Sequence, residues 1–198
     1  MDAFDTMDPA PAISNAQDVA RFFIQYYNDN DLPITNLMLN KLLYFAQGHC
    51  LAEYGRPLFA EPIEAWEYGP VVPAVYREYK PRGRKALLEL GAAIDYGDVF
   101  DDSTIALLVA VARQYRRYSD RGLVEKSHEE GGPWSKVYVK DEKHTPITEK
   151  SMRDGFGQKT LDDFEDEEFT EEEMAEFLEI SKAYRNGELE TVPLDELD

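Results

Sequence analysis

The sequence is poor in cysteine and histidine, with one cysteine, Cys50, and three histidines among 198 residues. A lone cysteine cannot form an internal disulfide. No apolar run approaches the ~20 residues that a membrane span needs. The first residues, 1–12, also lack the basic-then-apolar order of a secretory signal. These absences predict a cytoplasmic protein that makes no membrane contact.

Basic residues are also scarce, since 21 lysines and arginines stand against 40 aspartates and glutamates, for a net charge of −19. The imbalance is concentrated in residues 158–198, where 16 acidic and 3 basic residues give a net charge of −13. Direct binding of DNA or RNA requires clustered lysine and arginine against phosphate, and neither part of the chain has that excess. A basic protein is the natural partner of so acidic a chain.

Sequence motifs for catalysis are missing, because no P-loop, GxGxxG or GxSxG pattern occurs. Cys50 and His128 could in principle act as nucleophile and base, but a lone cysteine on an apolar helix face is usually a small core residue. Zinc binding would need a CxxC or HxxxH spacing, which His49, Cys50, His128 and His144 do not have. Carboxylates such as Glu61, Glu64 and Glu67 stand out only by abundance. We therefore predict no catalytic residue, no metal and no cofactor.

Apolar residues at helical spacing indicate a mainly α-helical domain. Ser14 and Gln17 form a capping box before a first amphipathic helix. Thr35 can cap a second helix that stops at Gly55. A short extended segment over 63–67 allows a small β-sheet. Pro70 then suits the first turn of a third helix, because its missing N–H is not needed there.

Further helices are expected in the second half of the domain. Residues 84–90 predict a short helix after the Pro81 and Gly83 break. The run 105–112 is apolar on every side and fits a buried strand or a central helix; continuation to Tyr118 favours the helix, because strands rarely reach about 16 residues. We interpret it as the buried central helix, capped by Asp101, Asp102 or Ser103. Two short segments complete the prediction, a helix or turn over 122–128 and a last helix over 148–156.

The acidic C-terminal extension, 158–198, carries its own helix signals. Six of the nine residues over 161–169 are acidic, with isolated apolar residues among them, and the segment should stay solvated. Thr170 and Glu173 then form a capping box for a helix over about 170–186. This helix either docks on its own domain or lies in a groove of a partner. We thus expect a flexible N-terminus over 1–13, a domain over 14–157 and this extension.

Two linked signatures are the most identifying features of the chain. Residues 39–48 read LNKLLYFAQG and residues 64–73 read EAWEYGPVVP. The pairing resembles the Panacea domain, a small non-catalytic module of prophage-associated proteins and of antitoxins from two-gene toxin–antitoxin loci, SocA-like proteolytic adaptors among them. The likeness covers about 14–157. A later loop, SHEEGGPW over 127–134, matches the family's His-x-x-x-Pro-Trp-like motif with one extra residue.

This resemblance implies a compact, multi-helix, mainly α fold and a protein-binding function. It implies an antitoxin that binds a toxin encoded beside it, or an adaptor that hands a bound toxin to a protease; an unrecognised enzyme is the third alternative. The motif residues would maintain the fold and frame the binding surface. The predicted partner-binding residues lie at the family motifs and on the apolar stripe of the C-terminal helix: Tyr68, Val72, Tyr76, His128, Trp134, Met174, Phe177, Leu178 and Tyr184.

Overall fold

A computed structural model describes residues 13–88, 95–142, 145–157, 159 and 161. The predicted helix over 170–186 and most of the predicted flexible N-terminus therefore lie outside the described residues. Within the described residues the fold is mainly helical with a small three-stranded antiparallel sheet, which confirms the predicted fold class. The helices are α1 Ala16–Asp29, α2 Asn36–Tyr54, α3 Pro73–Tyr79, α4 Asp102–Tyr115, α5 Asp120–Ser127 and α6 Glu149–Phe156.

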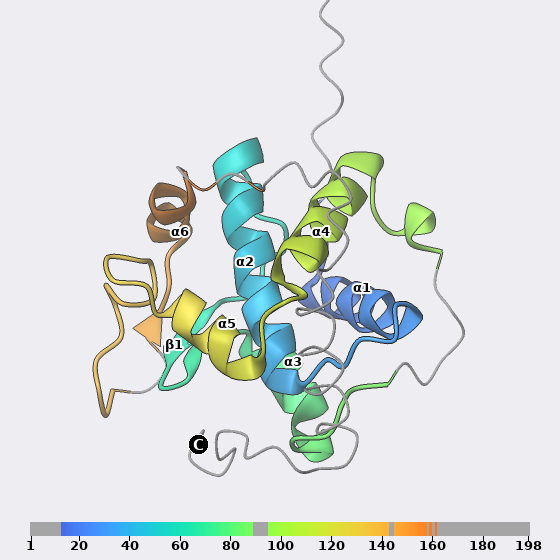
Figure 1. Ribbon diagram of the computed structural model, residues 1–198. Helices are drawn as coiled ribbons and strands as arrows, with labels where there is room; N and C mark the ends of the chain where they lie inside the picture. Colours follow the sequence, from blue (N-terminus) through green and yellow to red (C-terminus); the bar gives the residue numbers. More distant parts are fainter. Residues whose placement is uncertain (1–12, 89–94, 143–144, 158, 160, 162–198) are drawn as a thin grey trace, which may run out of the picture.

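Helix α2 is the centre of the domain. Figure 1 shows it between α1 and α4 on one side and α5, α6 and the sheet on the other. Fifteen of its 19 residues are buried, including polar ones. The run that the sequence indicated as the central helix is instead α4, whose Ala106 is exposed. The helical prediction was correct and the central position was wrong, because an all-apolar run cannot reveal how many neighbours surround it.

Local capping signals place most helix ends. Thr35 caps α2 by accepting a hydrogen bond from the Met38 N–H, and Gly55 ends it in the left-handed conformation at φ 68°. Asp101 and Thr148 cap α4 and α6 in the same way as Thr35 caps α2. The first helix is capped by Asn15 rather than by Ser14, whose N–H pairs with the Leu58 carbonyl.

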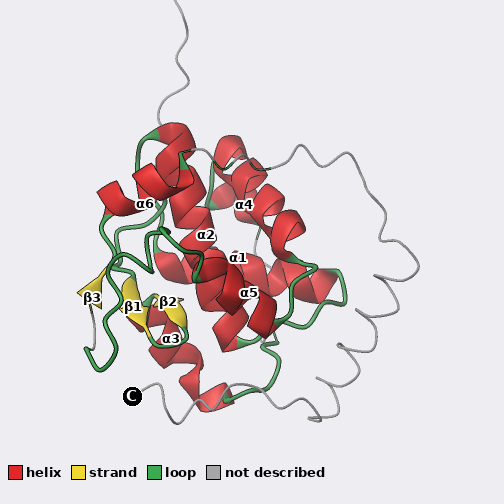
Figure 2. Cartoon of the chain, turned by 60° about the vertical axis from the view of Figure 1, so that its left-hand side comes forward, coloured by secondary structure: helices red, strands yellow, loops and turns green. Residues whose placement is uncertain are grey.

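The sheet and α3 differ from the prediction in one respect. Strands β1 Glu64–Trp66 and β2 Gly69–Val71 form a hairpin, and β3 Thr145–Pro146 pairs with the other edge of β1 (Figure 2). Pro70 therefore lies in a strand, and Pro73 is the first residue of α3. Both prolines suit a helix start, and the tertiary hydrogen bonds described below decide between them.

The segment after α3 contains short 3-10 turns at Lys80–Arg82 and, later, at Tyr96–Asp98. The helix predicted over 84–90 is wrong for its described part, since 84–88 are not helical. Leu87 explains the difference, because its N–H pairs with the Ile34 carbonyl and its side chain is buried. A tertiary contact thus holds the chain in a non-helical conformation where propensity alone favoured a helix.

Candidate partner-binding surface

Three polar side chains of α2 form hydrogen bonds with the backbone of the EAWEYGPVVP signature and of α3, which follows it. Lys41 Nζ donates to the Pro70 carbonyl at 3.1 Å. Asn40 Oδ1 accepts from the Val72 N–H at 2.9 Å, and Asn36 Nδ2 donates to the Tyr76 carbonyl at 3.1 Å. All three side chains are buried. Because a buried polar group must be paired, these bonds fix the hairpin and the start of α3 on α2 and link the two signatures.

Lys41 is fully buried, and burial lowers its pKa to about 7, against a smaller opposing effect of the Asp120 carboxylate. Gly69 lies directly above it with φ +99°, where a Cβ atom would be 2.7 Å from Lys41 Cε and from Ser127 Oγ. Only glycine meets both conditions. Gly69 is thereby required for close packing of the hairpin on α2 and α5.

A small aromatic cluster lies outside the main core, and we call it the hairpin cluster. It consists of buried Val71 and Tyr76 with half-buried Trp66 and Tyr68 packed against them. The rings of Trp66 and Tyr76 meet edge to face with centroids 5.0 Å apart. Tyr68 lies in the two-residue turn between β1 and β2. Partly exposed tryptophan and tyrosine on a fixed backbone are typical of binding hot spots.

His128 and Trp134 form the second part of the candidate surface, next to the hairpin cluster. Their rings stack at a centroid distance of 3.6 Å, and the Tyr138 ring also stacks on Trp134, at 4.5 Å. Trp134 Nε1 donates to the Trp66 carbonyl at 2.9 Å, which joins the stack to β1. Burial and the positive charge of Lys41 lower the pKa of His128 to about 4, so the imidazole is neutral at pH 7.

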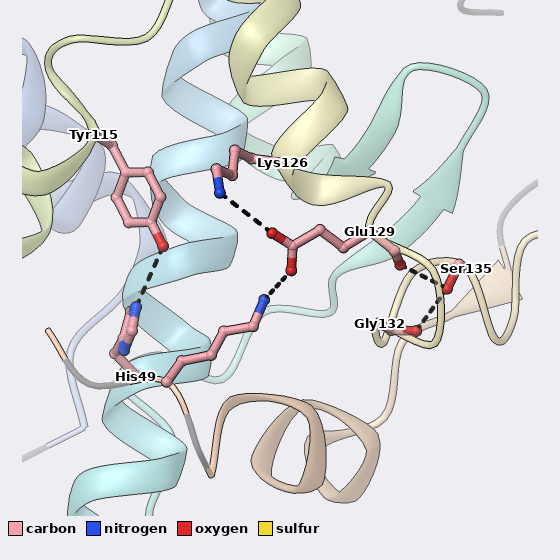
Figure 3. Close-up of polar contacts among 7 residues, drawn as sticks. His49, Tyr115, Lys126, Glu129, Gly132 and Ser135 are labelled. Atoms are coloured by element: carbon pink, nitrogen blue, oxygen red, sulfur yellow. Dashed lines mark hydrogen bonds and ion pairs between the residues drawn. The ribbon is translucent and has the colours of Figure 1, made fainter.

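The loop between His128 and Trp134 is held by its own polar contacts. Ser135 Oγ lies 3.0 Å from the Glu129 carbonyl and 3.1 Å from the Gly132 carbonyl (Figure 3). The Glu129 carboxylate accepts from Lys159 at 2.6 Å and lies 3.5 Å from Lys126 Nζ. The Lys159 hydrogen bond is the main reason that the pKa of Glu129 is lowered. The loop is therefore a rigid support for the ring stack.

The structure places the predicted binding residues at different depths. Val72, Tyr76 and Trp134 are buried, so they support the surface and offer little area to a partner. Tyr68 and His128 are half-buried at the hairpin cluster and at the ring stack. The four predicted residues of the C-terminal stripe lie outside the described residues: Met174, Phe177, Leu178 and Tyr184.

Two further residues of this surface, Trp66 and Tyr138, were not predicted to bind. Trp66 could have been found from the strand alternation, which places its side chain opposite the buried Ala65. Tyr138 carries no signal in the sequence, because only the tertiary structure stacks it on Trp134.

The catalytic alternatives gain no support from the geometry. Cys50 is buried, and burial raises its pKa to about 11, so the reactive thiolate is not formed at neutral pH. Glu61 accepts a hydrogen bond from the Ala16 N–H at the start of α1, and Glu64 accepts one from Trp66 Nε1. No cluster of three metal-ligating side chains occurs among the described residues, of which His144 is not one. In the same part of the chain no helix has the length and apolarity of a membrane span.

Comparison with known proteins identifies the family to which this chain belongs. The family model described as antitoxin SocA-like, Panacea domain, matches residues 39–135, from the first signature to the residue after Trp134. The chain belongs to this family of SocA-like antitoxins. One relative is Antitoxin SocA of Caulobacter vibrioides (strain NA1000 / CB15N), 36% identical over 140 residues that cover 67% of this chain and 73% of the relative. No solved structure gave a significant match.

Proposed function

We propose that this protein is an antitoxin that neutralises a toxin encoded by a neighbouring gene through direct binding in the cytoplasm, without catalysis. The family membership supports an antitoxin role. The observation that carries direct binding is the hairpin cluster, a partly exposed aromatic surface fixed by buried hydrogen bonds from α2. Pre-organised aromatic side chains bind with little loss of conformational entropy, which favours affinity.

The contact surface that we propose is Trp66 and Tyr68 of the hairpin with half-buried His128 and Tyr138 beside them. Val72, Tyr76 and Trp134 support it from below. The apolar stripe of the extension supplies a second contact through Met174, Phe177, Leu178 and Tyr184.

The proposed toxin is basic. The extension carries a net charge of −13, which attracts a positively charged partner and repels nucleic acid. Charge then speeds the encounter, while the aromatic surface supplies most of the contact area.

Tyr68→Ala tests the surface. If Tyr68 is a hot spot, its truncation should weaken toxin binding by about 2 kcal/mol, or about 30-fold in Kd. Co-expression with the neighbouring gene product should then no longer restore growth, and pull-down of the complex should fail. The melting temperature of the free protein should change little, because Tyr68 is half-buried in a turn.

Tyr26→Ala is the matched control. Tyr26 is a partly buried tyrosine that stacks on Phe22, and α1 lies on the other side of α2 from the hairpin (Figure 1). This variant should neutralise as well as the unmodified protein. Full neutralisation by Tyr68→Ala would exclude the hairpin as the contact surface. Absence of any complex or rescue by the unmodified protein would exclude the antitoxin function, and neutralisation that requires a cellular protease would identify the adaptor alternative.

A further inference from the structure

A groove of about 460 Å³ lies between the C-terminal part of α2, the middle of α4 and the end of α6. Small side chains line it, namely Ala52 on α2 with Ala106 and Ala110 on α4. Tyr54 and Phe156 also contribute to its wall. Small residues on two helices leave room for the larger apolar side chains of a third helix.

The described chain ends at this groove. Leu161, its last residue, lines the groove and packs against the main core. Lys159 lines it too and forms an ion pair with Glu129 at 2.6 Å. Lys159 and Leu161 of the extension therefore already lie on the domain, and the residues after Leu161 continue from the wall of the groove.

The length of the extension suits this groove. Residues 162–169 can span up to about 28 Å when extended. Residues 170–186 would form a helix of about 25 Å, close to the ~21 Å of α4 with its 14 residues. Tethering a segment to its site raises its effective concentration to about the millimolar range, so even weak docking is populated.

The alanines of the groove and the basic residue beside them complement the same segment, while Glu53 adds one acidic side chain to the lining. Residues 170–186 contain five acidic and two basic residues beside the apolar stripe of Met174, Phe177, Leu178 and Tyr184. On α4, Arg113 follows Ala106 and Ala110 along one helix face, is exposed, and has no ion pair among the described residues. An acidic amphipathic helix would thus place its stripe on the alanines and its carboxylates beside Arg113.

We propose that, in the free protein, residues 170–186 dock as a helix in this groove of their own domain. The docked helix covers the alanine-lined part of α4 and withholds its apolar stripe until a toxin competes for it. The docking concerns the protein without toxin, and only the competition by a toxin rests on the proposed function.

Amide hydrogen exchange of the full-length free chain tests this docking. Amides in 170–186 should exchange at least about tenfold more slowly than in an unfolded peptide of the same sequence. Ala110→Glu, which places a carboxylate and extra volume in the groove, should remove this protection while the amides of α2 stay protected. Retained protection of α2 shows that the variant is folded.

Ala74→Glu is the matched control, because Ala74 is also a half-buried helical alanine but lies on α3, near the opposite end of α2. In the Ala74→Glu variant the amides of 170–186 should be protected from exchange as strongly as in the unmodified chain. Exchange of 170–186 at the unfolded rate, or protection that survives Ala110→Glu, would overturn the proposal. Protection that disappears on dilution would also overturn it, since a second copy would then be the source of the docked helix.

Discussion

Several single side chains of α2 are polar and yet buried, and each has a defined partner. Gln47 donates to the Phe59 carbonyl and accepts from the Leu58 N–H, which ties the loop after α2 to the helix. In the same way, Asn40 accepts from the Val72 N–H of the EAWEYGPVVP signature, and Asn36 donates to the Tyr76 carbonyl of α3. Because an unpaired buried amide costs about 1–3 kcal/mol, these residues determine which loops can pack on α2.

His49 gives a prediction about pH. Burial, with a smaller effect of the Lys159 cation, lowers its pKa to about 4, below the ordinary 6.5. Between these values the unfolded chain binds the proton and the folded chain does not, so stability falls as pH decreases through this window. Between pH 7 and pH 5 His49 should reduce the free energy of unfolding by about 2 kcal/mol, measurable by urea denaturation at both pH values.

The control for this prediction is His49→Gln, which keeps a polar group near the Tyr115 hydroxyl, 3.4 Å from His49 Nε2. Its loss of stability between pH 7 and pH 5 should be smaller by the same amount. An equal pH dependence in both proteins would show that His49 is not the titrating group. His128 should contribute to the dependence that remains, because its pKa is also lowered to about 4.

Helices and strands approach one another most closely at glycines. A Cβ atom on Gly48 would lie 2.5 Å from the ring of Phe156, so this glycine lets α6 pack directly on α2. Gly69 plays the same role between the hairpin, Lys41 and Ser127. The two signatures therefore each contain a glycine that is needed for packing between elements.

Gly69→Ala should destabilise the domain by at least about 2 kcal/mol, because backbone strain at φ +99° and overpacking against Lys41 add together. Gly55→Ala is the matched control. Gly55 also has positive φ, at 68°, in the left-handed α conformation, but its Cβ would meet nothing within 4 Å, so only the strain of about 1 kcal/mol is expected. Thermal or urea unfolding of both variants measures the difference. Equal losses would mean that the close approach to Lys41 is relaxed at no cost.

The distribution of charge is a property of the whole molecule. Residues 158–198 carry −13 of the net charge of −19, so the domain itself is only moderately acidic. The hairpin cluster, in contrast, is aromatic. Under the proposed function, the extension would promote the encounter with a basic toxin and the domain would supply the stable contact.

Association with the toxin should therefore slow as salt rises. The screening length falls from ~10 Å at 0.1 M to ~3 Å at 1 M salt, which removes the attraction between distant charges. Stopped-flow measurement should show a lower on-rate with little change in the off-rate. Replacing Glu171, Glu172 and Glu173 by glutamine should reduce this salt dependence. An on-rate that does not change with salt would argue against electrostatic recruitment.

The sequence alone determined the helical class of the protein, the small sheet and most helix ends. These features depend on local signals, such as Thr35 and Gly55 at the ends of α2, which act within a few residues along the chain. The family signatures also predicted a protein-binding surface near Tyr68 and His128, and this remains a prediction. Caps and turns can be predicted from neighbouring residues alone, because distant residues do not determine them.

Only the tertiary structure decided which residues of the signatures lie inside. Val72, Tyr76 and Trp134 are buried because the hairpin is bonded to α2 and to the later loop, contacts that span up to 68 residues. The same long-range bonds put Pro70 in a strand, and the Leu87 contact keeps 84–88 from forming a helix. The burial of these residues and the conformation of these segments depend on which polar groups pair with each other in the folded protein. No local sequence pattern encodes that pairing.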